Sequence, residues 1–82
     1  MTDDPNTIAV REHFAHCLQV LGGPAAASRR LDIDERALRR FASGERPISA
    51  ALMADMAAAL RRLAADASAA EARIGLFGSG AT

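Results

Sequence analysis

Three sets of helix-breaking residues divide the middle of this chain into segments with room only for short helices. The first set is Gly22 to Pro24, the second is Asp32 to Asp34, and the third begins at Gly44. Glycine suits a left-handed helix end, proline suits the first helical position, and aspartate caps a helix N-terminus. The spacing therefore predicts two helices, over 24–31 and about 35–42, joined by a three-residue turn.

Each residue of the turn has an expected role. Asp32 is suited to a left-handed conformation, because short polar side chains tolerate it better than most others. Ile33 is apolar and is expected to plug the core, whereas Asp34 is expected to cap the second helix. In that helix the apolar positions fall at helical spacing and predict an inward face, formed by Ala37, Leu38 and Phe41. The outward face then carries Glu35, Arg36, Arg39 and Arg40.

Apolar stripes also predict a helix on each side of this pair. The stripe over 7–21 consists of Val10, Phe14, Cys17, Leu18 and Leu21. After Ser49, a plausible N-cap, a second stripe runs to about residue 72 through Leu52, Met56, Leu60 and Leu63, with Ala59 and Ala67 beside it. This last helix is long, so it either breaks near 66–68 or projects. With no strand pattern, the expected fold is all-α, a compact four- to five-helix bundle.

The length of 82 residues predicts one domain. We expect a disordered N-terminal tail over 1–6, the helical domain over 7–72, and an apolar C-terminal tail over 73–82. A domain of this size buries only about 60–65% of its unfolded surface, so a second copy would help its thin core. The expected dimer interface comprises Leu60, Leu63, Ile74, Leu76 and Phe77. In the alternative, the last helix packs on the first and the tail stays free.

Charge is distributed unevenly along the chain. The formal net charge is +0, yet the stretch from Ser28 to Arg46 holds six arginines and four acidic residues, a local charge of +2. All basic residues are arginine, which suits bidentate recognition of guanine and phosphate. The same arginine and alanine usage also agrees with a GC-rich bacterial genome, so composition alone does not identify the partner.

His13, His16 and Cys17 lie together and raise the question of a metal or a nucleophile. Cys17 belongs to the apolar stripe, which indicates a small core residue. No fourth ligand is evident nearby, and a bundle of this size offers little cleft for catalysis. The sequence therefore predicts no metal, no cofactor and no enzyme activity. A single cysteine excludes an internal disulfide, and neither a secretory signal nor a membrane-spanning segment is expected.

The central stretch resembles the helix-turn-helix of the lambda-repressor-like (Cro/Xre) family of bacterial and phage DNA-binding proteins. The matching residues are Ala27, Ser28, Leu31, the turn Asp32-Ile33-Asp34, Leu38, Phe41 and the string from Ser43 to Pro47. The flanking helices match only in length and pattern. Three positions depart from the family: Asp32 replaces a common glycine, Ser28 a common alanine, and Pro24 a glutamine that supports a phosphate contact.

The resemblance implies that 7–72 is a DNA-binding domain whose second short helix enters the major groove. Base edges would then be contacted by Glu35, Arg36 and Arg39. Phosphates would be contacted by Arg29, Arg30, Arg40 and Arg46.

The function expected from this resemblance is a sequence-specific regulator of transcription that binds double-stranded DNA. We expect a repressor that works as a homodimer in the cytoplasm, associated with the nucleoid. Two alternatives stay open. One is a protein-binding module such as an antitoxin or phage accessory protein, which the neutral charge and apolar tail favour. The other is an accessory subunit of DNA packaging or recombination.

Overall fold

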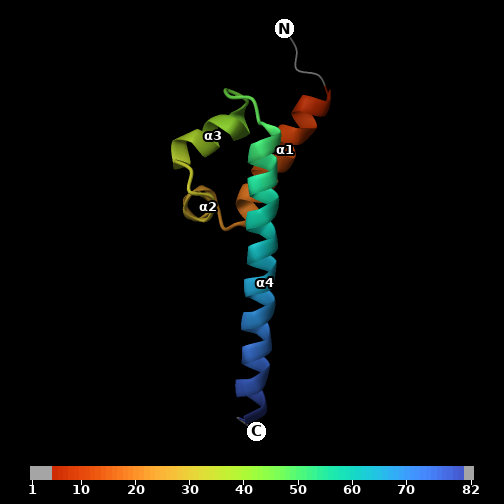
Figure 1. The fold of residues 1–82 in the computed structure, drawn as a ribbon, viewed down its shortest axis with the longest axis vertical. Coiled ribbons are helices and arrows are strands. Elements are labelled where there is room, and N and C mark those ends of the chain that lie inside the picture. Colours follow the sequence, from red (N-terminus) through yellow and green to blue (C-terminus); the bar gives the residue numbers. More distant parts are fainter. Residues whose placement is uncertain (1–4, 81–82) are drawn as a thin grey trace.

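Four helices, joined by short connections, make up the described part of the chain (Figure 1). The computed structural model describes the backbone of residues 5–80 and the side chains of residues 5–78. The helices are α1 (Pro5–Val20), α2 (Pro24–Leu31), α3 (Glu35–Ser43) and α4 (Ala50–Gly80). No strand occurs within residues 5–80, so the all-α expectation is confirmed.

Capping residues end α1 and begin α2 and α4 close to the positions that the sequence predicts. Gly22, with φ 110°, lies just past the end of α1, and the Gly23 N–H donates to the Leu18 carbonyl over 2.9 Å. Such a bond satisfies a helix carbonyl that would otherwise lack a partner. Pro24 then occupies the first position of α2. At the start of α4, the Ser49 hydroxyl accepts from the Leu52 N–H over 3.0 Å, which confirms the predicted N-cap.

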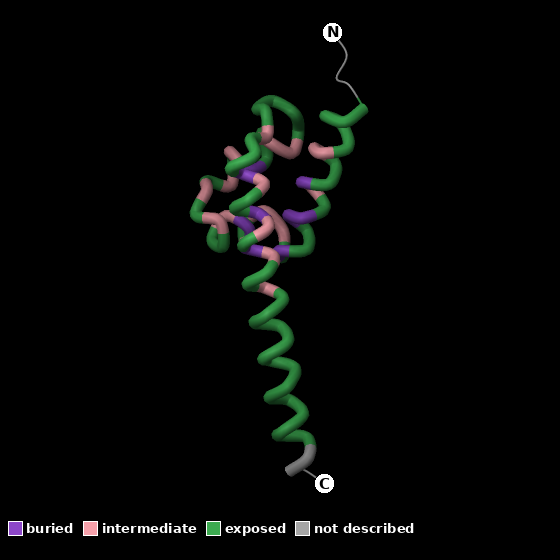
Figure 2. The backbone as a smooth tube through the Cα atoms, turned by 45° about the vertical axis from the view of Figure 1, so that its right-hand side comes forward, coloured by how far each residue is buried: buried purple, intermediate pink, exposed green. Residues whose placement is uncertain are grey.

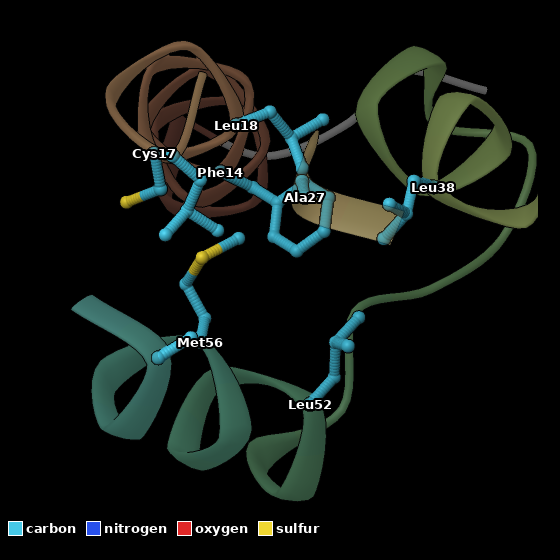
Figure 3. Close-up of a cluster of buried hydrophobic side chains, with 9 residues drawn as sticks. Phe14, Cys17, Leu18, Ala27, Leu38, Leu52 and Met56 are labelled. Atoms are coloured by element: carbon cyan, nitrogen blue, oxygen red, sulfur yellow. The ribbon is translucent and has the colours of Figure 1, made fainter. Parts of the chain in front are cut away.

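A small core lies where α1, α2, α3 and the first half of α4 meet (Figure 3). Phe14 and Ala27 are fully buried at its centre, with Leu38 and Met56 approaching from α3 and α4. The nine buried residues are Phe14, Cys17, Leu18, Leu21, Ala27, Leu38, Leu52, Met56 and Ala59. Most of the predicted apolar stripes therefore face inward, although Val10 is half-buried and Ala67 is exposed.

The shape differs from the expected compact bundle. The molecule measures 63 × 24 × 18 Å, and its radius of gyration is 16.4 Å, against about 12 Å for a compact domain of this length. The cause is α4, which continues without a break for 31 residues and extends well beyond the other helices (Figure 1). Of the two alternatives for this helix, projection is correct, and no break occurs near 66–68.

Both ends of the described chain are more helical than expected. Pro5 and Asn6 belong to α1, and residues 73–80 belong to α4 instead of a separate tail. The remainder of the expected N-terminal tail, residues 1–4, lies outside the described residues. The body of the molecule, here defined as α1 to α3 with residues 50–63 of α4, therefore carries a single helical extension.

Candidate nucleic-acid interface

The N-terminus of α3 is capped by Asp34. Its carboxylate accepts a hydrogen bond from the Arg36 backbone N–H over 3.1 Å, and its backbone is non-helical, with φ −56° and ψ 138°. The negative side chain also lies at the positive end of the helix dipole. The predicted cap is confirmed, and it fixes the point at which α3 begins.

One face of α3 anchors the helix to the body. Leu38 is fully buried, and Phe41 is half-buried, with its ring edge-on to Phe14 at 6.0 Å between centroids. Gly44 ends the helix in the left-handed region, at φ 89°. The atoms nearest to a Cβ at Gly44 would belong to the flexible Arg11 side chain, so the left-handed backbone is the constraint that favours glycine there.

The opposite face of α3 carries Arg36, Arg39 and Arg40, all exposed. At about 100° per residue, these three positions lie within roughly 100° of the helix circumference. Their backbone is fixed, because the other face of the helix is packed on the core. The arrangement holds three cationic side chains on the exposed face of α3, a short helix at the surface of the body (Figure 1).

Glu35 pairs with one of these arginines. Its Oε2 accepts a hydrogen bond from Nη2 of Arg39 over 2.6 Å, one helical turn away. Both side chains remain partly in solvent, so the pair contributes only about 0.3–0.5 kcal/mol to stability. Its more important effect is positional, since the carboxylate holds the Arg39 guanidinium close to the helix start.

The turn between α2 and α3 is closed by a contact that the sequence analysis did not predict. The Ser28 hydroxyl donates to the Ile33 carbonyl over 2.6 Å, and the Ile33 N–H donates to the Ser28 carbonyl over 3.2 Å. Asp32 lies between them at φ 56° and ψ 45°, the predicted left-handed conformation. No local pattern in the sequence signals this bond, because Ser28 and Ile33 lie on opposite sides of Asp32 and meet only once the turn has closed.

The arginines expected to contact phosphates lie in two places. Arg46 follows the end of α3, where its N–H donates to the Arg40 carbonyl over 3.2 Å. Arg29 and Arg30, on α2, instead line a groove of about 520 Å³ between α2 and α4. That groove also contains Arg62 and Asp55, and Arg62 was not identified from the sequence.

The cysteine–histidine cluster separates into a core residue and two surface residues. Cys17 is 4% exposed and lies among the core side chains (Figure 3), whereas His13 and His16 are exposed with ring centroids 5.9 Å apart. Burial raises the pKa of the Cys17 thiol, because the core disfavours the charged thiolate. Among the described residues, no group of three or more histidine, cysteine or acidic side chains is placed to hold a metal ion.

The residues expected at a dimer interface have two different environments. Leu60 and Leu63 are half-buried and pack against the core of their own chain. Ile74, Leu76 and Phe77 are 69%, 74% and 68% exposed on the extension of α4 (Figure 2).

None of the helices that the structure describes combines the length and the hydropathy that a bilayer span requires. Comparison with known proteins gave no match, whether to a protein-family model, to a curated protein or to a solved structure.

Proposed function

We propose that this protein binds double-stranded DNA in a sequence-specific manner through α3, as a regulator of transcription and specifically a repressor. The observation that carries the proposal is the exposed arginine face of α3, formed by Arg36, Arg39 and Arg40 on a helix held by the core. An α-helix with its side chains is about 10–12 Å across, which matches the width of the major groove of about 12 Å.

The connection between α2 and α3 supports a helix-turn-helix of the lambda-repressor-like kind. The turn is short, Asp32 provides its left-handed residue, and Ser28 ties the end of α2 to Ile33. In such motifs the first helix crosses the DNA backbone and the start of the second reaches base edges. Membership of that family is part of the proposal.

The roles proposed for the charged residues follow from their positions along α3. Arg36 lies nearest the capped start and is proposed to grip guanine O6 and N7. Arg39 is proposed to reach base edges, with Glu35 orienting its guanidinium or accepting from cytosine N4. Arg40 and Arg46 lie further along and are proposed to contact phosphates, as are Arg29 and Arg30 from α2.

The proposed mechanism is steric occupation of a promoter, since a helix that fills the major groove there excludes other proteins from the same site. A dimer would place two copies of α3 on one operator, and the operator would be an inverted repeat. Such a regulator works in the cytoplasm at the nucleoid.

The test is selection of bound duplexes from a random pool, followed by titration of the best site. Arg36→Ala and Arg39→Ala are expected to cost about 1–3 kcal/mol and to relax preference at one base pair. Arg40→Ala is expected to weaken all duplexes alike and to reduce the dependence on salt.

The matched control is Arg61→Ala, which removes the same charge from an exposed position on α4. It should leave both affinity and preference unchanged. The proposal that α3 contacts the bases would be rejected if the selection enriched no sequence. It would also be rejected if Arg36→Ala and Arg61→Ala lost equal affinity for the selected duplex.

The exposed apolar residues at the end of α4 favour a second candidate, a module that binds another protein. Under that candidate, purified protein would take up a partner at fixed stoichiometry and would bind duplexes only weakly and without preference.

A further inference from the structure

Among the described residues, no other element packs against the extension of α4. Every residue from 64 to 78 is exposed (Figure 2), including Ile74 and Phe77. An isolated helix gains little stability from propensity alone and is usually stabilised by packing of an apolar face. Exposed side chains of this size therefore indicate a surface that is covered in the working protein.

The apolar residues of α4 follow one continuous seven-residue repeat. Steps of three and four residues alternate through Met53, Met56, Leu60, Leu63, Ala67, Ala70, Ile74 and Phe77. In coiled-coil notation these residues occupy alternating a and d positions, which form the seam of a coiled coil. The first four lie against the body, whereas the last four face solvent. The stripe that packs on the body thus continues for two further heptads, about four helical turns, beyond it.

We propose that this stripe pairs with the same stripe of a second copy of the chain, with the two helices antiparallel. In the proposed register Leu60 lies opposite Phe77 of the second copy, Leu63 opposite its Ile74, and Ala67 opposite its Ala70. Large side chains meet at both ends of the overlap, and alanines meet at its centre, where they let the helices approach closely. The overlap, residues 60–77, lies almost entirely on the extension. Leu76 lies outside the seam.

The charged residues beside the seam select this arrangement. Asp66 and Arg73 occupy the g positions, and Glu71 occupies an e position. In an antiparallel pair, g residues face g residues, so the proposed register brings Asp66 of each copy to Arg73 of the other. Two oppositely charged contacts form, and Glu71 faces only Ala64.

Other arrangements create like-charge contacts. A parallel pair in register sets Asp66 against Glu71 of the second copy, twice. Sliding the antiparallel pair by one heptad sets Arg73 against Arg73 and Glu71 against Glu71, or in the other direction Asp66 against Asp66. Like charges that face each other across a coiled coil destabilise the arrangement that brings them together. The proposed register is therefore the one that the sequence favours.

The same geometry positions the two bodies. The body packs on α4 partly through Leu52 and Ala59, which are also g residues. Both bodies therefore lie on the same face of the coiled coil as the contacts between Asp66 and Arg73. With the two-fold axis midway between residues 60 and 77, the two Met56 positions lie about 38 Å apart along the coil at 1.5 Å per residue. Half-sites one turn of DNA apart are separated by about 34–36 Å. Only this comparison of spacings rests on the proposed function.

Charge reversal tests the pairing in the full-length chain. Sedimentation equilibrium is expected to show a dimer, and Asp66→Arg and Arg73→Asp should each raise its dissociation constant by roughly tenfold or more, because two attractive contacts become repulsive. An equimolar mixture of the two variants should dimerise again, since both contacts in the mixed pair are attractive. Under parallel pairing, Asp66→Arg would tighten the dimer, because the new side chain would face Glu71.

Ser68→Arg is the control, since it adds a positive charge to α4 at a position outside the seam. It should leave the dimer unchanged, and circular dichroism should report the helix content of the wild type for this variant. A monomeric wild type, a tighter dimer for Asp66→Arg, or a mixture no more associated than its components would overturn the proposal.

A fourth variant separates this inference from the proposed function. Ile74→Asp should give a monomer whose body still folds, because Ile74 makes no contact with the core. If α3 reads DNA, that monomer keeps its preference for a half-site with reduced affinity. A dimer that binds no duplex would contradict the proposed function and leave the pairing intact.

Discussion

The hydroxyl of Ser28 donates a hydrogen bond to the carbonyl oxygen of Ile33, 2.6 Å away, and the backbone of the same two residues is bonded in the reverse direction. The two bonds close the turn between α2 and α3. Leu31 and Ile33 also pack against the core beside this turn. The position of α3 relative to α2 therefore depends both on core packing and on this pair of hydrogen bonds.

Ser28→Ala is expected to destabilise the protein by about 1 kcal/mol, because the half-buried Ile33 carbonyl loses its side-chain donor. Urea unfolding followed by circular dichroism measures the change. Ser43→Ala is the matched control, since the Ser43 hydroxyl donates to the Arg40 carbonyl at an exposed helix end. Equal effects of the two substitutions would show that the turn does not depend on Ser28.

Asp32 holds a left-handed backbone, with φ 56°, in which a Cβ is unfavourable. Asp32→Gly should therefore be tolerated, because relief of strain offsets the extra freedom of the unfolded chain. Asp32→Val should cost about 1–2 kcal/mol, since a β-branched side chain fits this conformation poorly. Thermal unfolding of both variants measures the difference, and equal stabilities would argue against strain at this residue.

The turn and the caps were predictable because they depend on one or two residues at a time. Asp34, Gly44 and Ser49 each act through their own backbone or a group within three residues, so their type and spacing were sufficient. The bond from Ser28 was not predictable, because it needs the turn to have closed already. The ion pair of Glu35 and Arg39 could have been inferred from their spacing of four residues.

The course of α4 was harder to predict for a different reason. Its second half is rich in alanine, which favours helix, and it contains Gly75 and Gly78, which suggest a tail. The helix preference of alanine and the opposite preference of glycine nearly cancel. The local sequence therefore does not decide whether the helix ends before residue 73 or continues. The seven-residue repeat through Ile74 and Phe77 was present in the sequence and agrees with a continuous helix.

Leu38 and Phe41 anchor α3 to different extents. Leu38 is fully buried, so Leu38→Ala should cost about 2–5 kcal/mol, which is a large part of the stability of a small domain. Phe41 is half-buried at the edge of the core, and Phe41→Ala should cost less. Denaturant unfolding of both variants at equal concentration checks the order. The reverse order would mean that α3 is rotated about its axis relative to the structure.

Cys17 should make the protein less stable as the pH becomes alkaline. Burial raises the pKa of its thiol above the ordinary value of 9.0, so the folded state holds the proton more tightly than the unfolded state. The contribution of the buried thiol to the free energy of unfolding is fully present below the pKa that Cys17 has in the unfolded chain. It is lost as the pH rises from that value through the pKa that Cys17 has in the folded state. Stability should therefore decline above about pH 9.

The composition of the chain allows the effect of Cys17 to be measured without interference from other side chains. It contains no lysine and no tyrosine, so Cys17 is the one side chain that titrates between about pH 8 and 11. Urea midpoints across that range should fall for the wild type and stay level for Cys17→Ala, even though the variant is less stable throughout. The α-amino group titrates alike in both proteins and cancels in the comparison. Parallel curves for the two proteins would show that the thiol ionises as readily in the folded state as in the unfolded chain.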